Sequence, residues 1–207
     1  MSLDATPDAT PDATPTAQAR PRRFSTTDLA LIAAFAALIS ACAYVGAIPL
    51  GSAGVPITLQ TFAVMLTGCL LGPVRGFAAV TLYLTLGAIG LPVFAEHSAG
   101  LGAFTSVSAG YLISFPFAAA LGGFLVAYVA GPRRKTRAAW VFCCSMAASI
   151  LVIHPMGIVG MALHQDVSLW TAATWDAPFW VGDLLKTTLV AIIAAEVHRA
   201  FPKLLHP

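Results

Sequence analysis

Hydrophobic residues are distributed along the chain in six long runs, and polar or helix-breaking residues separate each run from the next. The runs cover residues 27–47, 57–71, 74–89, 110–130, 138–163 and 179–200. A helix that crosses a membrane needs about 20 mostly apolar residues, so the second run is short for a full span. The pattern predicts an all-α integral membrane protein with six transmembrane helices.

The segments between the runs contain signals that start and stop helices. Gly72 and Pro73 separate the second run from the third, because proline cannot continue a preceding helix without losing a hydrogen bond. One of residues 25–27 is predicted to cap the first helix, with Asp28 favourable in its first turn. The glycine-rich stretch 95–109 is too polar to span and is predicted to form a loop that could cover a pocket.

Composition agrees with a membrane location and excludes several classes of function. Of the 207 residues, 58% are hydrophobic and 10% are charged, against about 25% charged in an average soluble domain. The net charge of +2 is too small to predict a nucleic-acid partner. The four cysteines lie in apolar runs without metal-ligand spacing, so we expect no metal site and no cofactor. No phosphate-binding glycine loop occurs, so any ATP must be bound by another subunit.

Basic residues predict which side of the membrane holds the termini. With six spans, ten of the eleven lysines and arginines fall on one face, and the opposite loops hold Glu96, Asp166 and Asp176. Cytoplasmic loops carry the excess of lysine and arginine, so both termini are predicted to be cytoplasmic. The ten residues are Arg20, Arg22, Arg23, Arg75, Arg133, Arg134, Lys135, Arg137, Arg199 and Lys203.

The first 24 residues differ from the rest of the chain. Residues 4–15 repeat the sequence DATP three times, with no large apolar side chain. Such a polar, proline-rich segment cannot bury enough apolar surface to fold. We therefore predict a disordered tail over residues 1–24, without a cleavable signal peptide, and a six-helix membrane domain over residues 25–207.

Lys186 is the eleventh basic residue, and it lies inside the sixth apolar run one helical turn after Asp183. Charges within hydrocarbon cost roughly 2.5–3.5 kcal/mol each on insertion scales and normally mark a functional site. The pair could form the polar floor of a pocket that opens outward, in the outer half of the membrane. It could instead be a salt bridge that fixes helix packing, since residues three apart on a helix are neighbours.

Other polar and aromatic residues predicted near the outer face have two interpretations each. Gln60, at the start of the second run, needs a hydrogen-bond partner that could be a ligand or another helix. Phe94 and Tyr111 flank the predicted loop and could cover a ligand or anchor helix ends at the interface. His154 and the proline after it could simply pack at a kink in the fifth run.

The first run is rich in alanines spaced four residues apart, which let two helices approach closely. The spacing favours a helix-packing face, either inside this chain or against a partner. The alanines concerned are Ala30, Ala33, Ala34, Ala37 and Ala41.

In order and spacing, these motifs resemble the BioY family, the biotin-specific S components of energy-coupling factor (ECF) vitamin transporters. The chain departs from the family pattern at residues 106–111 and 180–183, at the expected pocket mouth. The matching segments are the alanine-rich first run, Val55-Pro-Ile-Thr-Leu-Gln-Thr61, Leu71-Gly-Pro73, Tyr83-Leu84 with Gly87, Gly90-Leu-Pro-Val-Phe94, Gly110-Tyr111 with Phe115-Pro116, and Gly182-Asp183 with Lys186.

The resemblance implies a non-enzymatic, multi-pass subunit of a bacterial or archaeal cytoplasmic membrane that binds biotin from outside. It would dock through the alanine face onto a membrane-embedded coupling protein, itself attached to two ABC ATPases. The lipid bilayer is its other partner. Asp183 would accept from a ureido N–H of biotin, and Lys186 would hold the ureido carbonyl or the carboxylate tail. Gln60, Tyr111, Phe94 and Trp180 would complete the substrate-binding set.

Three other functions remain open at this stage. The pocket chemistry also fits an S component or secondary carrier for another small amphiphilic vitamin. An intramembrane enzyme would use Asp183 or His154 as acid or base, although no second catalytic group stands at a recognisable spacing. A purely structural membrane subunit would tolerate the loss of Lys186.

Overall fold

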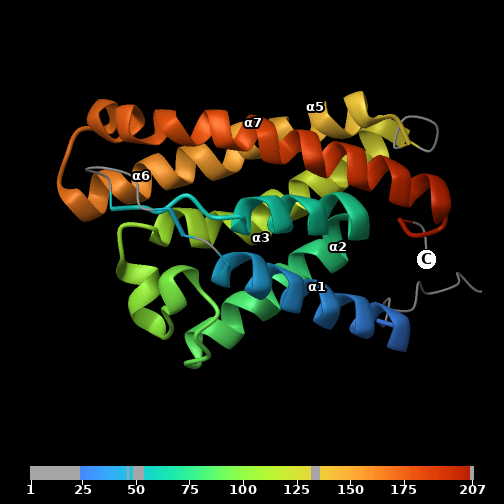
Figure 1. Ribbon diagram of the computed structural model, residues 1–207, viewed down its shortest axis with the longest axis horizontal. Helices are drawn as coiled ribbons and strands as arrows, with labels where there is room; N and C mark the ends of the chain where they lie inside the picture. The colour runs from blue at the N-terminus through green and yellow to red at the C-terminus, as the bar shows by residue number, and fades with distance from the viewer. Residues whose placement is uncertain (1–23, 46, 49–53, 132–135, 206–207) are drawn as a thin grey trace, which may run out of the picture.

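Among the residues that the structure describes, five helices are long and apolar enough to cross a membrane (Figure 1). The computed structural model describes residues 24–45, 47–48, 54–131 and 136–205, so the predicted tail lies almost wholly outside the described residues. In the described part, β-pairing is limited to one isolated bridge between Ile48 and Ile57. The five spans are α1 (Thr26–Tyr44), α2 (Gln60–Ala88), Ala109–Ala130, Ala138–Gln165 and α7 (Leu169–Ala200).

Two of the spans contain a π-helical turn, and two short 3-10 helices lie in the predicted loop. Ala109–Ala130 consists of α3 (Ala109–Phe124) and the π-helical η4 (Leu125–Ala130). Ala138–Gln165 consists of α5 (Ala138–Ala148), the π-helical η5 (Ser149–Ile153) and α6 (His154–Gln165). The 3-10 helices between α2 and α3 are η2 (Ala95–His97) and η3 (Leu101–Thr105). Turns of π-helix are frequent at functional sites, and η5 lies directly before His154.

Helix α2 is a hairpin whose two halves lie side by side. Gly72 has φ 80° and ψ −179°, outside the helical region, and Pro73 follows it, as the predicted break requires. The side-chain amide of Gln60 donates to the Tyr83 hydroxyl over 2.6 Å. In a straight helix these residues would lie about 35 Å apart at 1.5 Å per residue. The chain therefore reverses direction at Gly72, as the ribbon in Figure 1 shows.

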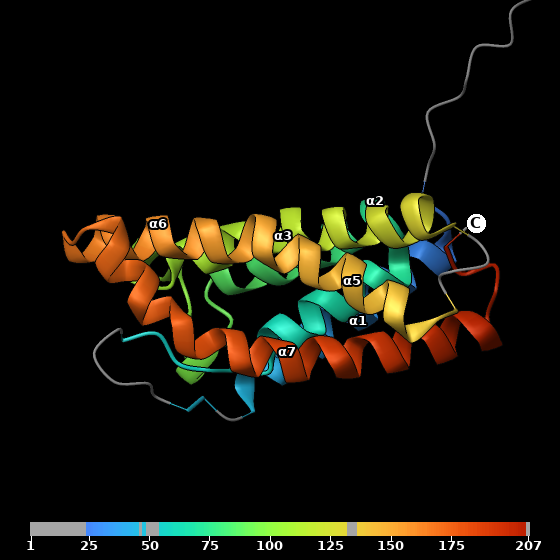
Figure 2. The ribbon, with the colours of Figure 1, turned by 90° about the horizontal axis from the view of Figure 1, so that it is seen from above.

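The helices pack closely around α2, which contacts α1, α3 and α7. Helix α7 also packs against α5 and α6 and extends along the length of the molecule (Figure 2). Gly68 of α2 faces the backbone of α3, and a Cβ atom there would collide with the Ala119 carbonyl. Small residues of this kind allow membrane helices to approach without a hydrophobic driving force between them. This packing places α2, α3, α6 and α7 around one space.

Helix α7 begins ten residues earlier than the hydrophobic pattern predicts. Its first residue is Leu169, capped by the Ser168 hydroxyl, which accepts from the Thr171 N–H over 3.1 Å. Pro178 lies within the helix. Asp176, expected in an outer loop, is therefore a helical residue and is completely buried. The expected loop was wrong because Asp176 is hydrogen-bonded to buried side chains, and the Thr174 hydroxyl donates to the Thr171 carbonyl within the helix.

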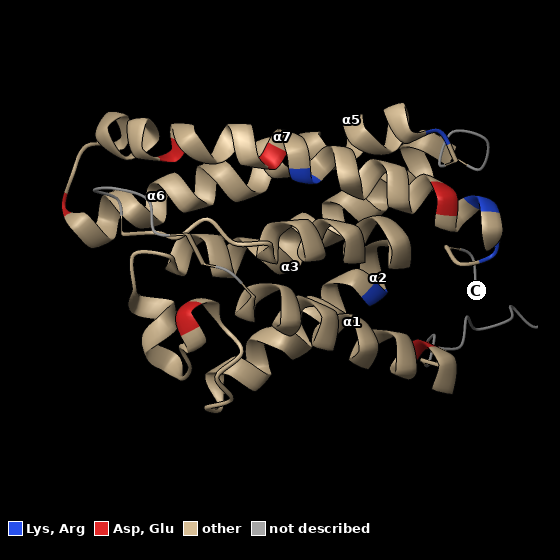
Figure 3. Cartoon of the chain, in the orientation of Figure 1, with Lys and Arg blue, Asp and Glu red and all other residues tan. Residues whose placement is uncertain are grey.

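Arg75 joins three segments near the C-terminal end of the molecule, where the lysines and arginines gather in Figure 3. Its guanidinium forms an ion pair with Asp28 at 3.0 Å and donates to the Leu71 carbonyl at 3.0 Å and to the Leu204 carbonyl. Asp28 lies in the first turn of α1, as predicted, and forms a capping box with the N-cap residue Ser25. This arginine thus connects the start of α1, the α2 hairpin and the segment after α7.

Replacing Arg75 with alanine should lower the free energy of unfolding by roughly 1–3 kcal/mol, because Asp28 and two carbonyls would lose a charged donor. Thermal unfolding of the detergent-purified protein measures this change. Arg199→Ala is the matched control, because the Arg199–Glu196 pair is more than half exposed. Exposed pairs contribute little, so the control should change stability by less than about 0.5 kcal/mol. Equal destabilisation by both substitutions would contradict the assignment.

Candidate functional site

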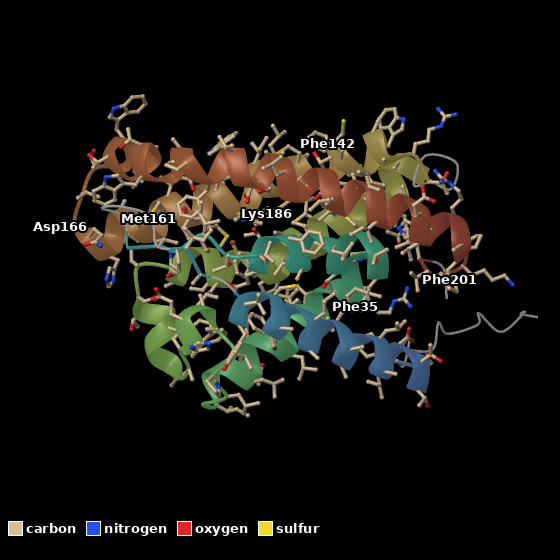
Figure 4. The ribbon with its side chains drawn as sticks, viewed as in Figure 1. Phe35, Phe142, Met161, Asp166, Lys186 and Phe201 are labelled. Carbon is tan, nitrogen blue, oxygen red and sulfur yellow. The ribbon has the colours of Figure 1, made fainter. Side chains whose placement is uncertain are left out.

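A pocket lies between α2, α3, α6 and α7, with Lys186 on its wall. Figure 4 places Lys186 midway between Asp166 at one end of the molecule and Phe201 at the other. The empty space is about 520 Å³, including the part open to solvent. Its lining residues are Val55, Pro56, Thr58, Gln60, Thr61, Ala95, Ser108, Tyr111, Leu112, Phe115, Ile153, His154, Phe179, Asp183 and Lys186.

Asp183 and Lys186 form the ion pair that their spacing allows, and they do so at the pocket wall. The ammonium nitrogen of Lys186 is 3.2 Å from Asp183 Oδ1 and donates to the Thr61 hydroxyl at 3.0 Å. Asp183 also accepts from the Thr61 hydroxyl at 3.4 Å and from the Ser149 hydroxyl at 3.3 Å. Both predicted roles of the pair, helix packing and pocket floor, are therefore compatible with this geometry.

A second buried carboxylate, Asp176, lies behind the pocket and accepts three hydrogen bonds. The Tyr111 hydroxyl donates to Oδ1 over 2.6 Å, and the Trp180 indole N–H donates to Oδ2 over 2.8 Å. Nδ1 of His154 is also 2.8 Å from Oδ2. Three donors on two oxygens satisfy an ionised carboxylate, which accepts hydrogen bonds and donates none. Asp176 thereby fixes the orientation of three side chains around the pocket.

His154 bridges the two carboxylates. Its ring is almost fully buried, with Nδ1 on Asp176 and Nε2 3.5 Å from Asp183 Oδ2. The imidazole stacks on the Trp180 indole with ring centroids 4.5 Å apart and planes at 21°. Together with Lys186, these groups place two anions and two basic side chains around one small space.

Two further predicted residues, Gln60 and Tyr111, line the pocket and also have protein partners. Gln60 donates to Tyr83, so the helix partner that the sequence left open exists, and its side chain still borders the pocket. Tyr111 donates to Asp176, and its ring lies 5.9 Å from that of Phe179. Both residues therefore hold fixed orientations at the pocket wall.

The other two predicted residues, Phe94 and Trp180, lie beside the pocket rather than among the residues that line it. Phe94 is 1% exposed and packs edge-on against Tyr83 and Phe104, with ring centroids at 5.4 and 5.7 Å. It borders a neighbouring cavity beneath η2 and η3, the predicted covering loop. Trp180 is 44% exposed, and its indole stacks on the His154 ring. Contact of either residue with a ligand stays a prediction.

Sequence reasoning missed the pairing of His154 with Asp176. The signal was present as an acid seven residues before Asp183, which is two helical turns on the same face. It was obscured because α7 was predicted to start after Asp176. Among the residues that the structure describes, no group of three potential metal ligands occurs. The contacts at the site are hydrogen bonds and paired charges.

The alanine face of α1 points away from the rest of the protein. Ile32, Ala36, Ile39 and Ala43 form the buried side of the helix. All five alanines singled out in the sequence are exposed: Ala30, Ala33, Ala34, Ala37 and Ala41. The face is consequently accessible to another helix, and its docking role stays a prediction.

Comparison with known proteins gives consistent results at the levels of family, relatives and fold. Residues 16–203 match the BioY family. The biotin transporter BioY of Rhodobacter capsulatus is 40% identical over 187 residues, covering 86% of this chain and 96% of the relative. A probable biotin transporter BioY of Pyrococcus horikoshii is 35% identical over 171 residues, covering 82% and 95%. The solved S-component for biotin from an ECF-type ABC transporter matches with a TM-score of 0.79 and 26% identity, covering 84% of this chain and 91% of that one.

Proposed function

The chain belongs to the BioY family, and from this premise we propose that it binds biotin and serves as the substrate-specific subunit of an ECF-type ABC transporter. The observation that carries the proposal is the Asp183–Lys186 pair on the wall of a pocket within a helical membrane protein. Charged side chains within a membrane cost free energy, and those that occur there usually contact a ligand or a partner.

The donors and acceptors of the pocket match those of biotin. Its ureido ring offers two N–H donors and one carbonyl, its thioether ring is apolar, and its tail ends in a carboxylate. Asp183 is an acceptor for a ureido N–H, and Lys186 is a cation for a carbonyl or carboxylate. Phe115 and Phe179 supply apolar surface in the same lining.

The proposed topology is six transmembrane spans with both termini in the cytoplasm of a bacterial or archaeal cell. The reversal at Gly72 supports six rather than five spans, since it divides α2 into two antiparallel halves. Arg75, Arg137 and Arg199 lie in or next to segments that this topology assigns to the cytoplasmic side, as the positive-inside rule requires.

The proposed partners are a membrane-embedded coupling protein and two ABC ATPases. The lack of a phosphate-binding loop in this sequence supports a separate ATP-binding subunit. The exposed alanines of α1 support docking through that helix, since small side chains let a partner helix approach closely.

Calorimetric titration of the detergent-purified chain alone with biotin tests the function. We expect saturable binding of one biotin per chain, without any other subunit. Riboflavin and thiamine serve as competitors. The proposal is supported if neither vitamin displaces biotin. Absence of biotin binding, together with binding of another vitamin, would favour the alternative of an S component or carrier for a different amphiphile.

A further inference from the structure

His154 is a pocket residue with hydrogen-bonding capacity that the protein does not use. Its side chain is 3% exposed, and Nε2 forms no hydrogen bond with any residue that the structure describes. The nearest carboxylate oxygen, Asp183 Oδ2, is 3.5 Å from Nε2, which is too long for a firm hydrogen bond. Leaving a buried polar atom without a partner is unfavourable, so a ligand atom that pairs with Nε2 would be bound more tightly.

Asp176 determines which His154 nitrogen faces the pocket. The carboxylate accepts from Nδ1, as well as from Tyr111 and Trp180, so Nδ1 carries a proton. The imidazole ring cannot turn over without breaking this bond and the stack on Trp180. Nε2 is therefore held on the side of Asp183.

Both ring nitrogens of His154 face a carboxylate oxygen, which accepts a hydrogen bond from an N–H. The charged groups facing the ring are Asp176 and Asp183, both on α7, and Lys186, which contacts Asp183. A fully buried carboxylate such as Asp176 needs a counter-charge, and His154 is its basic neighbour. An Nε2 atom without a proton would direct its lone pair at an oxygen of Asp183, which would be a repulsive contact.

We propose that His154 is an additional specificity-determining residue, whose Nε2–H donates to the carbonyl of a cyclic urea while Asp183 accepts from the adjacent N–H. In a five-membered cyclic urea the carbonyl is flanked by two N–H groups, so each edge of the urea presents the carbonyl acceptor beside one N–H donor. A donor and an acceptor 3.5 Å apart, Nε2 and Oδ2, are the complementary pair for that edge. The inference rests on the proposed function, since biotin supplies the urea.

The test compares two substitutions by calorimetry with biotin. His154→Phe keeps a flat ring against Trp180 but removes the donor, and it should lower affinity about 10- to 150-fold, the contribution of a hydrogen bond to a charged group. His154→Gln keeps an N–H donor and should restore affinity to within about threefold of the parent chain. Equal losses in both variants, or no loss in His154→Phe, would overturn the proposal.

Two biotin analogues separate a ligand contact from a structural effect. Desthiobiotin keeps the urea, so His154→Phe should weaken its binding by the same factor as for biotin. 2-Iminobiotin carries a guanidine in place of the urea. The protonated guanidine present at neutral pH offers only N–H donors where biotin has its carbonyl, so the substitution should cause less than about threefold loss. A uniform loss for all three ligands would assign His154 a structural role. If the unsubstituted chain fails to bind biotin, the proposed function itself fails, which is a distinguishable result.

Discussion

Replacing Lys186 with methionine is expected to lower biotin affinity by about 100-fold or more. Methionine keeps the aliphatic length and removes the ammonium that contacts Thr61 and Asp183. Truncating one member of a buried charge pair at a binding site costs about 2–5 kcal/mol, much of it from the charge left unpaired. Asp183→Asn should have an effect in the same range, because the amide removes the anion and one acceptor. Calorimetric titration of each purified variant measures these changes.

Lys203→Met is the matched control for the lysine substitution. Lys203 is exposed and lies outside the pocket, so this substitution should change biotin affinity by less than about twofold. Thermal unfolding of each variant in detergent separates weaker binding from loss of fold. A stable Lys186→Met chain that binds biotin as tightly as the parent would mean that the ion pair only fixes helix packing.

The helices could be predicted because the membrane imposes a simple rule on sequence. A spanning segment must be apolar throughout, and glycine with proline interrupts it, as at Gly72 and Pro73. The start of α7 could not be predicted in this way. Residues 169–178 contain Thr171, Thr174 and Asp176, which resemble a loop until their hydrogen bonds are known.

Asp183 and Lys186 could be predicted because charges are rare within an apolar run and each therefore carries information. The position of Gln60 beside them depends on the α2 hairpin, and that of Tyr111 depends on α3. The pairing of His154 with Asp176 joins α6 to α7 across 22 residues. Local spacing could place Asp176 on the same face as Asp183 but could not identify its partner on another helix. Phe94 and Trp180 were expected in the pocket from their aromatic character, but neighbouring rings decide where they pack.

Placing tryptophan at Ala37 is expected to reduce biotin uptake more than about tenfold while leaving biotin binding unchanged. Ala37 is exposed in the middle of α1, and an indole there would keep a partner helix from approaching closely. The pocket is formed by α2, α3, α6 and α7, so the substitution should leave it intact. Uptake of labelled biotin by cells that also produce the coupling protein and ATPases measures the loss. Calorimetry on the purified variant measures binding.

Ala139→Trp distinguishes docking from a general intolerance of bulk at the lipid-facing surface. Ala139 is an exposed alanine of α5, on a helix that the proposed docking does not use. Tryptophan there should preserve both uptake and binding, because a large apolar side chain is tolerated where it meets lipid. Co-purification of the coupling protein should fail for Ala37→Trp and succeed for the control. Normal uptake and co-purification with Ala37→Trp would show that the exposed alanines of α1 meet lipid, and another surface would then have to contact the coupling protein.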